Sequence, residues 1–471
     1  MTSNSTRRWT VALTGIGSLM AALDTLVVAA ALSTIRLDLD ASVEQLEWTV
    51  NSYNLSFAVL LVTGAALGDR LGRRRLYAAG LALFAIASAL CALAPDAVWL
   101  IAARALQGAG AALLMPLGLT LLTAAFPPER RGAALGMFSA VTGIAVASGP
   151  LVGGAVVEGI AWEWIFWLNV PVGLIAAPLA LAKLEESFGS ARAFDVRGLA
   201  LITASALGVV WGLVRANDAG WLSVEVLASL LAGLALGVLF WAWEGRAREP
   251  MFPVHLFRNR SFAAGNGAVF FTFAALFSCV FLFAQFLQTS LGFSPLEAGL
   301  RLMPWTITFL LVAPAAGALA DRIGERPLLL FGLLLQAAGL LWIALIAASG
   351  MAYSELVAPL VIAGVGVSMA VPAGQSSVVG GLEVAELGKA AGANSTMREL
   401  GGVFGIAVVV AVFAAAGSYA SAAEFSDGFV AAVGLAAGLS LLGAITAVAL
   451  PTLTEVPNVA GGKPETEGAR S

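Results

Sequence analysis

The sequence predicts an all-α membrane protein, and three observations lead to this prediction. The 471 residues are 59% hydrophobic, and the 52 glycines bring the apolar share to about 70%, against roughly 45–50% in soluble domains. Charged residues make up 11% of the chain, where about 25% is usual. The apolar residues gather in runs long enough to cross a bilayer, which takes roughly 20 residues per helix. Composition therefore excludes a soluble globule, and the low charge excludes a disordered chain.

Fourteen apolar runs predict fourteen transmembrane helices. They lie at 10–32, 46–68, 77–95, 97–123, 133–157, 163–182, 198–214, 222–243, 262–288, 296–320, 327–348, 355–378, 391–416 and 428–450. The first run could be read as a signal peptide, but its length and the acid Asp24 in its middle favour a retained helix.

The positive charges predict the orientation of the helices. If the N-terminus is cytoplasmic, twenty Lys and Arg residues fall in the inside segments and three, Arg36, Arg215 and Arg301, fall outside. We therefore expect both termini in the cytoplasm. The scarcity of lysine suggests GC-rich coding, so we expect a multi-pass protein of a bacterial plasma or inner membrane.

One segment recurs and divides the chain. The run Gly68-Asp69-Arg70-Leu71-Gly72-Arg73-Arg74 returns as Ala320-Asp321-Arg322-Ile323-Gly324-Glu325-Arg326, each time after the second helix of a six-helix set. A parallel repeat of this kind predicts two six-helix bundles, with spans seven and eight inserted between them. The predicted domains are a first bundle at 1–183, an inserted pair with linker at 184–261, a second bundle at 262–450 and a disordered cytoplasmic tail at 451–471.

The repeated loops are candidates for a cytoplasmic gate. Glycine lets the chain turn tightly, and the Asp can pair with an Arg of the same or a neighbouring loop and hold that face closed. The alternative is a basic loop that only sets topology, but two copies in matching positions favour a gate. The gate candidates are Asp69, Arg70, Gly72, Arg73, Asp321, Arg322 and Gly324.

These loops resemble the loop motif of the major facilitator superfamily. The fourteen spans with an inserted pair resemble its drug:proton antiporter family, the EmrB/QacA-type multidrug exporters. The resemblance implies the major facilitator fold and a proton-coupled exporter of hydrophobic drug-like compounds such as antibiotics or dyes. The family pattern has a Gly four residues before the Asp, which Gly317 matches and Ala65 does not.

Asp24 is the first candidate for proton coupling. It lies in the middle of span one with no Lys or Arg within a helical turn, so we expect it to be unpaired. Acids at membrane depth are rare and functional by default, and burial favours the neutral carboxyl, which can then exchange a proton. The segment also resembles the Leu-Asp-x-Thr motif in the first helix of the antiporter family. The alternative is a structural acid bonded to neighbouring helices.

Arg104 is the second candidate. A buried guanidinium does not lose its proton, so it can only influence a nearby carboxyl or bind a carbonyl. Gly108 and Gly110 allow another helix to approach. The run resembles the fourth-helix motif of the superfamily, which implies a part in proton transfer. The alternative is an arginine that only satisfies backbone carbonyls.

Span five carries a pattern that points to the direction of transport. Pro150 removes a helical hydrogen bond and bends the helix, and the glycines thin one face. The spacing resembles the antiporter motif of exporters, with Ala145 in place of the middle Gly, and this implies export. The residues are Gly136, Gly149, Pro150, Gly153 and Gly154.

Span thirteen and span nine supply candidates for a substrate cavity, namely Asn394, Arg398, Glu399 and Gln285. Arg398 and Glu399 are adjacent, so on a helix they point about 100° apart. We therefore expect that they do not face each other and that one lines the cavity while the other pairs in a loop. Their role as a gate or as a substrate contact stays open. We expect a minority of the aromatic residues in spans nine and ten to line an adaptable pocket.

Other classes of function are disfavoured. The only histidine, His255, lies in a basic linker, and two cysteines provide neither a disulfide framework nor a metal site. The sequence has no phosphate-binding loop of the Walker type, and its net charge of −4 gives no footprint for nucleic acid. We expect a monomer without cofactor or metal whose partners are a hydrophobic small molecule, protons and the bilayer. The alternatives are a dedicated exporter or importer of one metabolite and, less favoured, a membrane-embedded enzyme.

Overall fold

The computed structural model describes residues 4–126, 128–189, 195–247, 250, 252–379 and 386–451. Every element in this part of the chain is a helix. The first bundle holds α1 (Asn4–Asp38), α2 (Val43–Leu71), α3 (Arg73–Ala92), α4 (Ala97–Ala125), α5 (Pro128–Gly159), α6 (Trp164–Trp167) and α7 (Asn169–Lys183), followed by α8 (Val196–Ala219) and α9 (Val224–Glu244). After η1 (Val254–Arg258), the second bundle holds α10 (Arg260–Thr289), α11 (Pro295–Arg301), α12 (Met303–Ile323), α13 (Glu325–Ile346), α14 (Tyr353–Val379), α15 (Leu387–Ala416) and α16 (Ala422–Val448).

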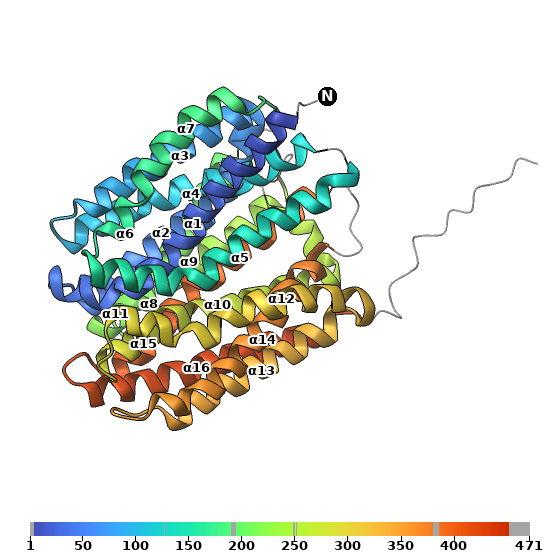
Figure 1. The fold of residues 1–471 in the computed structure, drawn as a ribbon. Coiled ribbons are helices and arrows are strands. Elements are labelled where there is room, and N and C mark those ends of the chain that lie inside the picture. The colour runs from blue at the N-terminus through green and yellow to red at the C-terminus, as the bar shows by residue number, and fades with distance from the viewer. Residues whose placement is uncertain are drawn as a thin grey trace, which may run out of the picture.

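The helices form two bundles with an inserted pair, as the sequence predicts (Figure 1). Two of the predicted spans are broken: α6 and α7 meet at Leu168, and α11 and α12 meet at Leu302. With each broken span taken as one, thirteen helices in the described residues are long and apolar enough to cross a membrane. Helix α5 lies in the place of the fifth predicted span.

The two copies of the repeated segment adopt the same turn. Gly72 separates α2 from α3 with a φ of 108°, and Gly324 separates α12 from α13 with a φ of 87°. A side chain is strained at such positive φ angles, and glycine is not. The tight turns predicted from the two glycines are therefore present at matching places in the two bundles.

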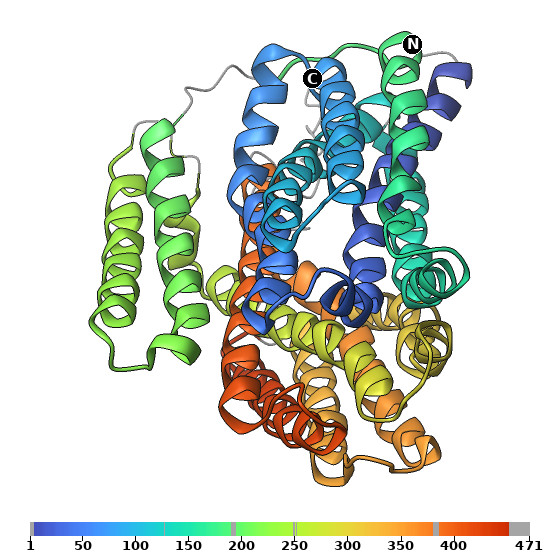
Figure 2. The ribbon, with the colours of Figure 1, turned by 90° about the vertical axis from the view of Figure 1, so that its left-hand side faces the viewer.

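The inserted helices α8 and α9 form a hairpin beside the two bundles. Ser205 donates to the Gly233 carbonyl at 2.8 Å, and Ser229 donates to the Gly208 carbonyl at 2.8 Å. Figure 2 shows the pair standing to one side of the bundles, and α8 packs on α2 of the first bundle and α15 of the second. The pair thus covers one side of the seam between the bundles.

The bundles meet closely at one end of the molecule. We call the end with the Gly72 and Gly324 turns the basic end and the other the opposite end. At the opposite end, the Gln288 amide donates to the Ala30 carbonyl at 3.0 Å, and the Arg36 guanidinium carbon lies 4.5 Å from the centre of the Tyr419 ring. These contacts join α1 to the second bundle.

Helices α5 and α11 extend the same closure. A Cβ on Gly154 would lie 2.2 Å from the Pro295 carbonyl oxygen, and one on Gly299 would lie 2.3 Å from the Pro150 carbonyl oxygen. The backbone amide of Leu296 donates to the Glu158 carboxylate at 3.0 Å. We call the α1–α10, Arg36–Tyr419 and α5–α11 contacts together the opposite-end seal.

Candidate functional site

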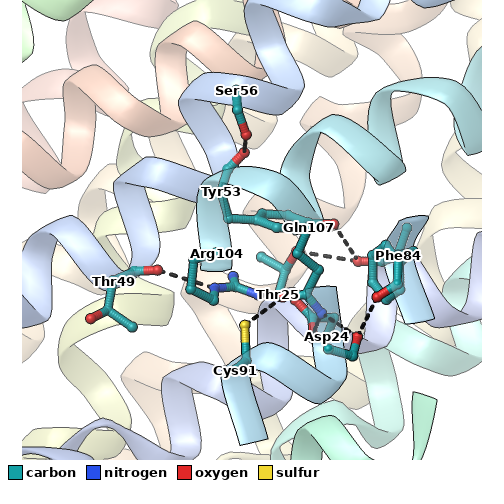
Figure 3. A network of polar contacts seen from close by, with 11 residues as sticks. Asp24, Thr25, Thr49, Tyr53, Ser56, Phe84, Cys91, Arg104 and Gln107 are labelled. Carbon is teal, nitrogen blue, oxygen red and sulfur yellow. Dashed lines mark hydrogen bonds and ion pairs between the residues drawn. The ribbon is translucent and has the colours of Figure 1, made fainter. Parts of the chain in front are cut away.

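Asp24 forms a buried ion pair with Arg104. The carboxylate of Asp24 on α1 and the guanidinium of Arg104 on α4 are 3% and 1% exposed, and Arg104 donates directly to Asp24 Oδ2 (Figure 3). The expectation that Asp24 is unpaired was therefore wrong. Its partner is 80 residues away in sequence, so only the packing of α1 on α4 brings the two together.

Arg104 also binds a backbone carbonyl. Its Nε donates to the carbonyl oxygen of Thr49 on α2 at 3.1 Å. Both contacts that the sequence allowed for a buried guanidinium, to a carboxyl and to a carbonyl, are thus present. Arg104 joins α1, α2 and α4 at one point in the first bundle.

Gln107 is a member of this network that sequence reasoning missed. Its amide donates to Asp24 Oδ1 at 2.7 Å and to the Ser88 hydroxyl at 2.9 Å, and its oxygen accepts from Arg104. A residue three positions after Arg104 lies on the same helix face, so its spacing was the available signal. With Gln107 in place, both carboxylate oxygens of Asp24 are hydrogen-bonded.

Tyr53 lies against the guanidinium and completes the network. The Arg104 guanidinium carbon is 4.2 Å from the centre of the Tyr53 ring and 5.8 Å from that of Phe166, a cation–π arrangement. The Tyr53 hydroxyl donates to the Ala21 carbonyl at 3.3 Å. Because Arg104 stays charged, protonation of Asp24 would remove one charge of the pair and leave the guanidinium with Thr49, Gln107 and the rings.

A cavity of about 200 Å³ lies between the two bundles beside this network. Its wall includes Ala21, Ala22, Thr25 and Leu26, the residues of α1 that flank Asp24. The rest of the wall is mainly aromatic and aliphatic, with polar groups at a few places. The aromatic and polar members are Phe57, Phe273, Phe277, Trp305, Phe309, Thr306, Gln375, Arg398 and Glu399.

Arg398 and Glu399 both line the cavity and pair with each other. The Nε of Arg398 donates to Glu399 Oε1 at 2.8 Å. The expectation that adjacent positions keep them apart was wrong, because the long arginine side chain bends back to reach its neighbour. Asn394 contacts Asn266, and Gln285 accepts from the Tyr419 hydroxyl. Neither Asn394 nor Gln285 is among the described residues that line the cavity.

The repeated loops contact their own surroundings at the basic end. Asp69 pairs with Arg73 at 2.7 Å, and the Asp69 carbonyl accepts from the backbone amide of Gly189 at 3.0 Å. Arg70 and Arg322 are exposed. The side chain of Asp321 lies outside the described residues. In the first copy, the acid therefore pairs within its loop and the loop is held to the segment that follows α7.

The glycines at the end of α5 pack closely against α1 and against the second bundle. Gly149 and Gly153 pack against Leu26 and Val27 of α1, where a Cβ would come within 2.5 Å and 3.0 Å of their atoms. Gly154 meets α11 in the opposite-end seal. The surroundings of Gly136 are outside the described part of the structure. The α5 motif thus contacts the helix that carries Asp24 on one side and the second bundle on the other.

Comparisons with known proteins agree with this architecture. A model of the Major Facilitator Superfamily matches residues 14–244 and 265–470. A solved peptide transporter POT in complex with sulfate superposes with a TM-score of 0.69 and 16% identity, covering 93% of this chain and 94% of that chain. At this identity, the likeness shows the fold alone.

Curated relatives are similar over most of the sequence. The tetracenomycin C resistance and export protein of Streptomyces glaucescens is 35% identical over 408 residues, 86% of this chain and 75% of that protein. The multidrug resistance protein Stp of Mycobacterium tuberculosis is 34% identical over 415 residues, 88% and 77% of the two chains. The methylenomycin A resistance protein of Streptomyces coelicolor is 34% identical over 436 residues, 92% and 91%. The chain is a multi-pass membrane protein that belongs to the Major Facilitator Superfamily.

Proposed function

We propose that the protein is a proton-coupled exporter of hydrophobic, drug-like compounds that works by alternating access. The observation that carries this proposal is the position of α1. This helix places Asp24 in a buried ion pair and supplies Ala21, Ala22, Thr25 and Leu26 to the wall of the central cavity. A change of charge at Asp24 therefore acts on the helix that a substrate touches.

The coupling follows from the contacts of Asp24. When Asp24 takes up a proton, its charge attraction to Arg104 is lost, and α1 and α4 are held together less strongly. Leu26 and Val27 of the same helix pack on α5, and the Ala30 carbonyl binds Gln288 of α10 across the seam. Protonation can thus shift the balance between a state closed at the opposite end and a state open there.

The cavity favours aromatic substrates of low net charge. Its wall is mainly aromatic and aliphatic, and its two charged groups, Arg398 and Glu399, neutralise each other. The names of relatives refer to tetracenomycin C, methylenomycin A and multidrug resistance, which supports an antibiotic or dye as the substrate class.

The two ends of the molecule take different parts in this scheme. In this scheme the basic end and both termini face the cytoplasm of a bacterium, as the distribution of positive charge predicts. Asp69 and its counterpart Asp321 gate this end. At the other end, Gly154 of α5 makes the close packing of the opposite-end seal. A monomer is sufficient, since the cavity lies between two bundles of one chain.

The proposal is tested with purified protein in proteoliposomes. Asp24→Asn keeps the size of the side chain and removes its charge, so we expect pH-gradient-driven export to be abolished while substrate counterflow persists. Expression and dye binding serve as controls for folding. Full gradient-driven export by this variant would contradict proton coupling at Asp24.

Breadth of substrate is a separate question. Arg398, Glu399 and Gln375 give the cavity polar groups in fixed places, which favours a second candidate, an exporter dedicated to one compound. A transport panel of aromatic antibiotics and dyes on the same proteoliposomes separates the two. Transport of several unrelated scaffolds supports the multidrug exporter, and transport of one supports the dedicated exporter.

A further inference from the structure

Helix α2 carries a second buried carboxyl group that lies outside the Asp24 network. Glu47 is 1% exposed. Its Oε1 accepts from the Asn51 amide at 3.3 Å, and its Oε2 has no partner among the described residues. Asn51 Oδ1 and both polar side-chain atoms of Asn54 are also buried without a described partner. We call Glu47, Asn51 and Asn54 the Glu47 cluster.

The cluster lies beside the path between the bundles. One side of α2 carries Glu47, Asn51, Asn54 and Phe57, which follow one another at intervals of four, three and three residues. Phe57 is in the wall of the central cavity. The cluster therefore continues from the cavity toward the opposite end of the molecule.

The side of α2 next to Asn51, away from Phe57, meets the second bundle and α8. Leu55 and Val59 follow Asn51 at intervals of four residues, and both belong to an apolar cluster with Val403 of α15. The cluster thus lies next to the seam that must part when the opposite end opens. In this structure the seam is closed, and the cluster is buried.

In the described part of the chain, charged groups that α4, α8 and α15 bring to α2 are engaged with other partners. Glu44, one turn earlier on α2, pairs with Arg215 of α8 at 3.9 Å. On α4, Arg104 binds Asp24 and Thr49, and on α15 Arg398 binds Glu399. Among the described residues, Glu47 has no cation as a partner. An ionised carboxylate buried without a counter-ion is strongly unfavourable, so the closed seam fits only the protonated form of Glu47.

We propose that the Glu47 cluster is a second proton-binding site, whose proton is taken up from the opposite side when that end closes and returned to the same side when it opens. In the open state water reaches Glu47, which then ionises as an ordinary glutamate does. Closing joins one proton from water to the Glu47 carboxylate, and opening releases it. This proton is not transported, and that distinguishes it from the proton of Asp24. The inference rests on the proposed alternating access.

The proposal gives a definite sign for pH. At pH values above the ordinary pKa of a glutamate, the closed state binds one proton more than the open state. The ratio of closed to open molecules must then fall as the pH on that side rises, by at most tenfold per pH unit for one proton. Low pH on the opposite side closes the protein.

Distance measurements between spin labels test this proposal. Leu37 on α1 is 73% exposed and Ala420 lies exposed between α15 and α16, next to Arg36 and Tyr419, which meet across the seam. The background carries Leu37→Cys and Ala420→Cys, with Cys91 and Cys279 changed to Ala. In lipid nanodiscs at varied pH, we expect the short-distance population to grow as the pH falls.

Variants separate Glu47 from other groups. Glu47→Gln keeps the size and the hydrogen bonds and is permanently neutral, so we expect a mainly closed population with most of the pH response lost. Glu44→Gln, a control one turn away, should retain the response, and Asp24→Asn should retain the part that Glu47 contributes. Size-exclusion profiles and dye binding establish that Glu47→Gln is folded, and Glu47→Asp should restore a pH response.

Two outcomes would overturn the proposal. One is an unchanged pH response in Glu47→Gln, and the other is a background protein without any pH response. Neither outcome bears on the transport test of Asp24→Asn, so the second site and proton-coupled export fail separately.

Discussion

Among the described residues, each bundle contains an ion pair with a buried acid, and the two pairs are built differently. Asp24 and Arg104 come from different helices, and the side chains of both are 1% exposed. Arg398 and Glu399 are neighbours on one helix, and the arginine side chain is 21% exposed toward the cavity. The first pair therefore connects structural elements, whereas the second places two opposite charges in front of a substrate.

The difference assigns different work to the two pairs. A pair between helices makes their packing depend on the charge of each partner, which is what proton coupling requires. A pair within one helix does not join two elements by its ion pair, although the Arg398 guanidinium carbon also lies 5.6 Å from the centre of the Phe273 ring on α10. Its loss should therefore disturb the packing less. It changes instead the electrostatics of the cavity. The predictions that follow, from the largest expected effect to the smallest, test this division.

The largest effect is expected from Arg104→Gln. This change leaves Asp24 buried without a counter-ion, which costs about 3–5 kcal/mol of stability. The double variant Asp24→Asn with Arg104→Gln should recover much of that loss, because no buried charge remains. Thermal unfolding of the purified proteins in detergent measures the cycle.

Arg398→Gln is the matched variant in the second bundle. Its partner Glu399 is 5% exposed and borders the cavity, where water can hydrate an acid that has lost its counter-ion. We therefore expect a loss of about 1–3 kcal/mol, smaller than for Arg104→Gln. Equal losses in the two bundles would show that both pairs hold helices together and would remove the contrast.

Gln107→Leu is expected to reduce the initial rate of pH-driven export about tenfold. The change removes the hydrogen bonds to Asp24 and Ser88, and an unsatisfied buried acceptor costs about 1–3 kcal/mol. The control is Gln336→Leu, a buried glutamine of the second bundle whose Oε1 has no described partner. If both variants export at the same rate, Gln107 only fills space.

The sequence predicted the fold far better than it predicted the contacts of the site. Apolar runs, arginine-rich loops and the repeat each have a local signature, and they were sufficient for fourteen spans in two bundles with an inserted pair. The helix ends were less accurate, since α1 extends over Asn4–Asp38 where 10–32 was predicted. Hydropathy detects the membrane-embedded part of a helix and misses the turns beyond it.

The site required knowledge of which helices touch. Asp24 and Arg104 were each identified as candidates, but their pairing depends on how α1 packs on α4, which no local pattern encodes. Glu47 was missed because it lies at the outer edge of its predicted span, where an acid is ordinarily solvated. Its burial depends on how the helices around α2 pack, which the local sequence does not encode.

A smaller, several-fold effect is expected for the charge of the substrate. The cavity wall contains one acid, Glu399, which Arg398 already neutralises. A dication would need two carboxylates to offset its desolvation, so neutral, monocationic or anionic aromatic compounds should be preferred. Competitive efflux of a monovalent dye against a bis-cationic compound of similar size measures this preference.

Glu399→Gln sharpens that test. The variant leaves Arg398 as an unpaired positive charge in the cavity, so anionic compounds should gain and monocations should lose affinity several-fold. If the parent protein transports the dication at an equal or better rate, the path contains an acid that acts on substrates, and Glu47 is then the first residue to examine.

The smallest effect is expected at a third ion pair, between Asp69 and Arg73 at the basic end. These side chains are 26% and 19% exposed and four residues apart on the chain, so the pair contributes only about 0.3–0.5 kcal/mol to stability. Asp69→Asn should therefore leave the unfolding temperature and dye binding nearly unchanged. We expect it to slow turnover several-fold, because the substitution weakens the Asp69–Arg73 pair in a loop that must move when the basic end opens and closes. Single-turnover efflux measures the rate, and equilibrium dye titration measures binding. Arg70→Gln, at an exposed position, is the matched control for a change of charge in the same loop. Weaker binding with unchanged turnover would place Asp69 on the substrate path and not in a gate.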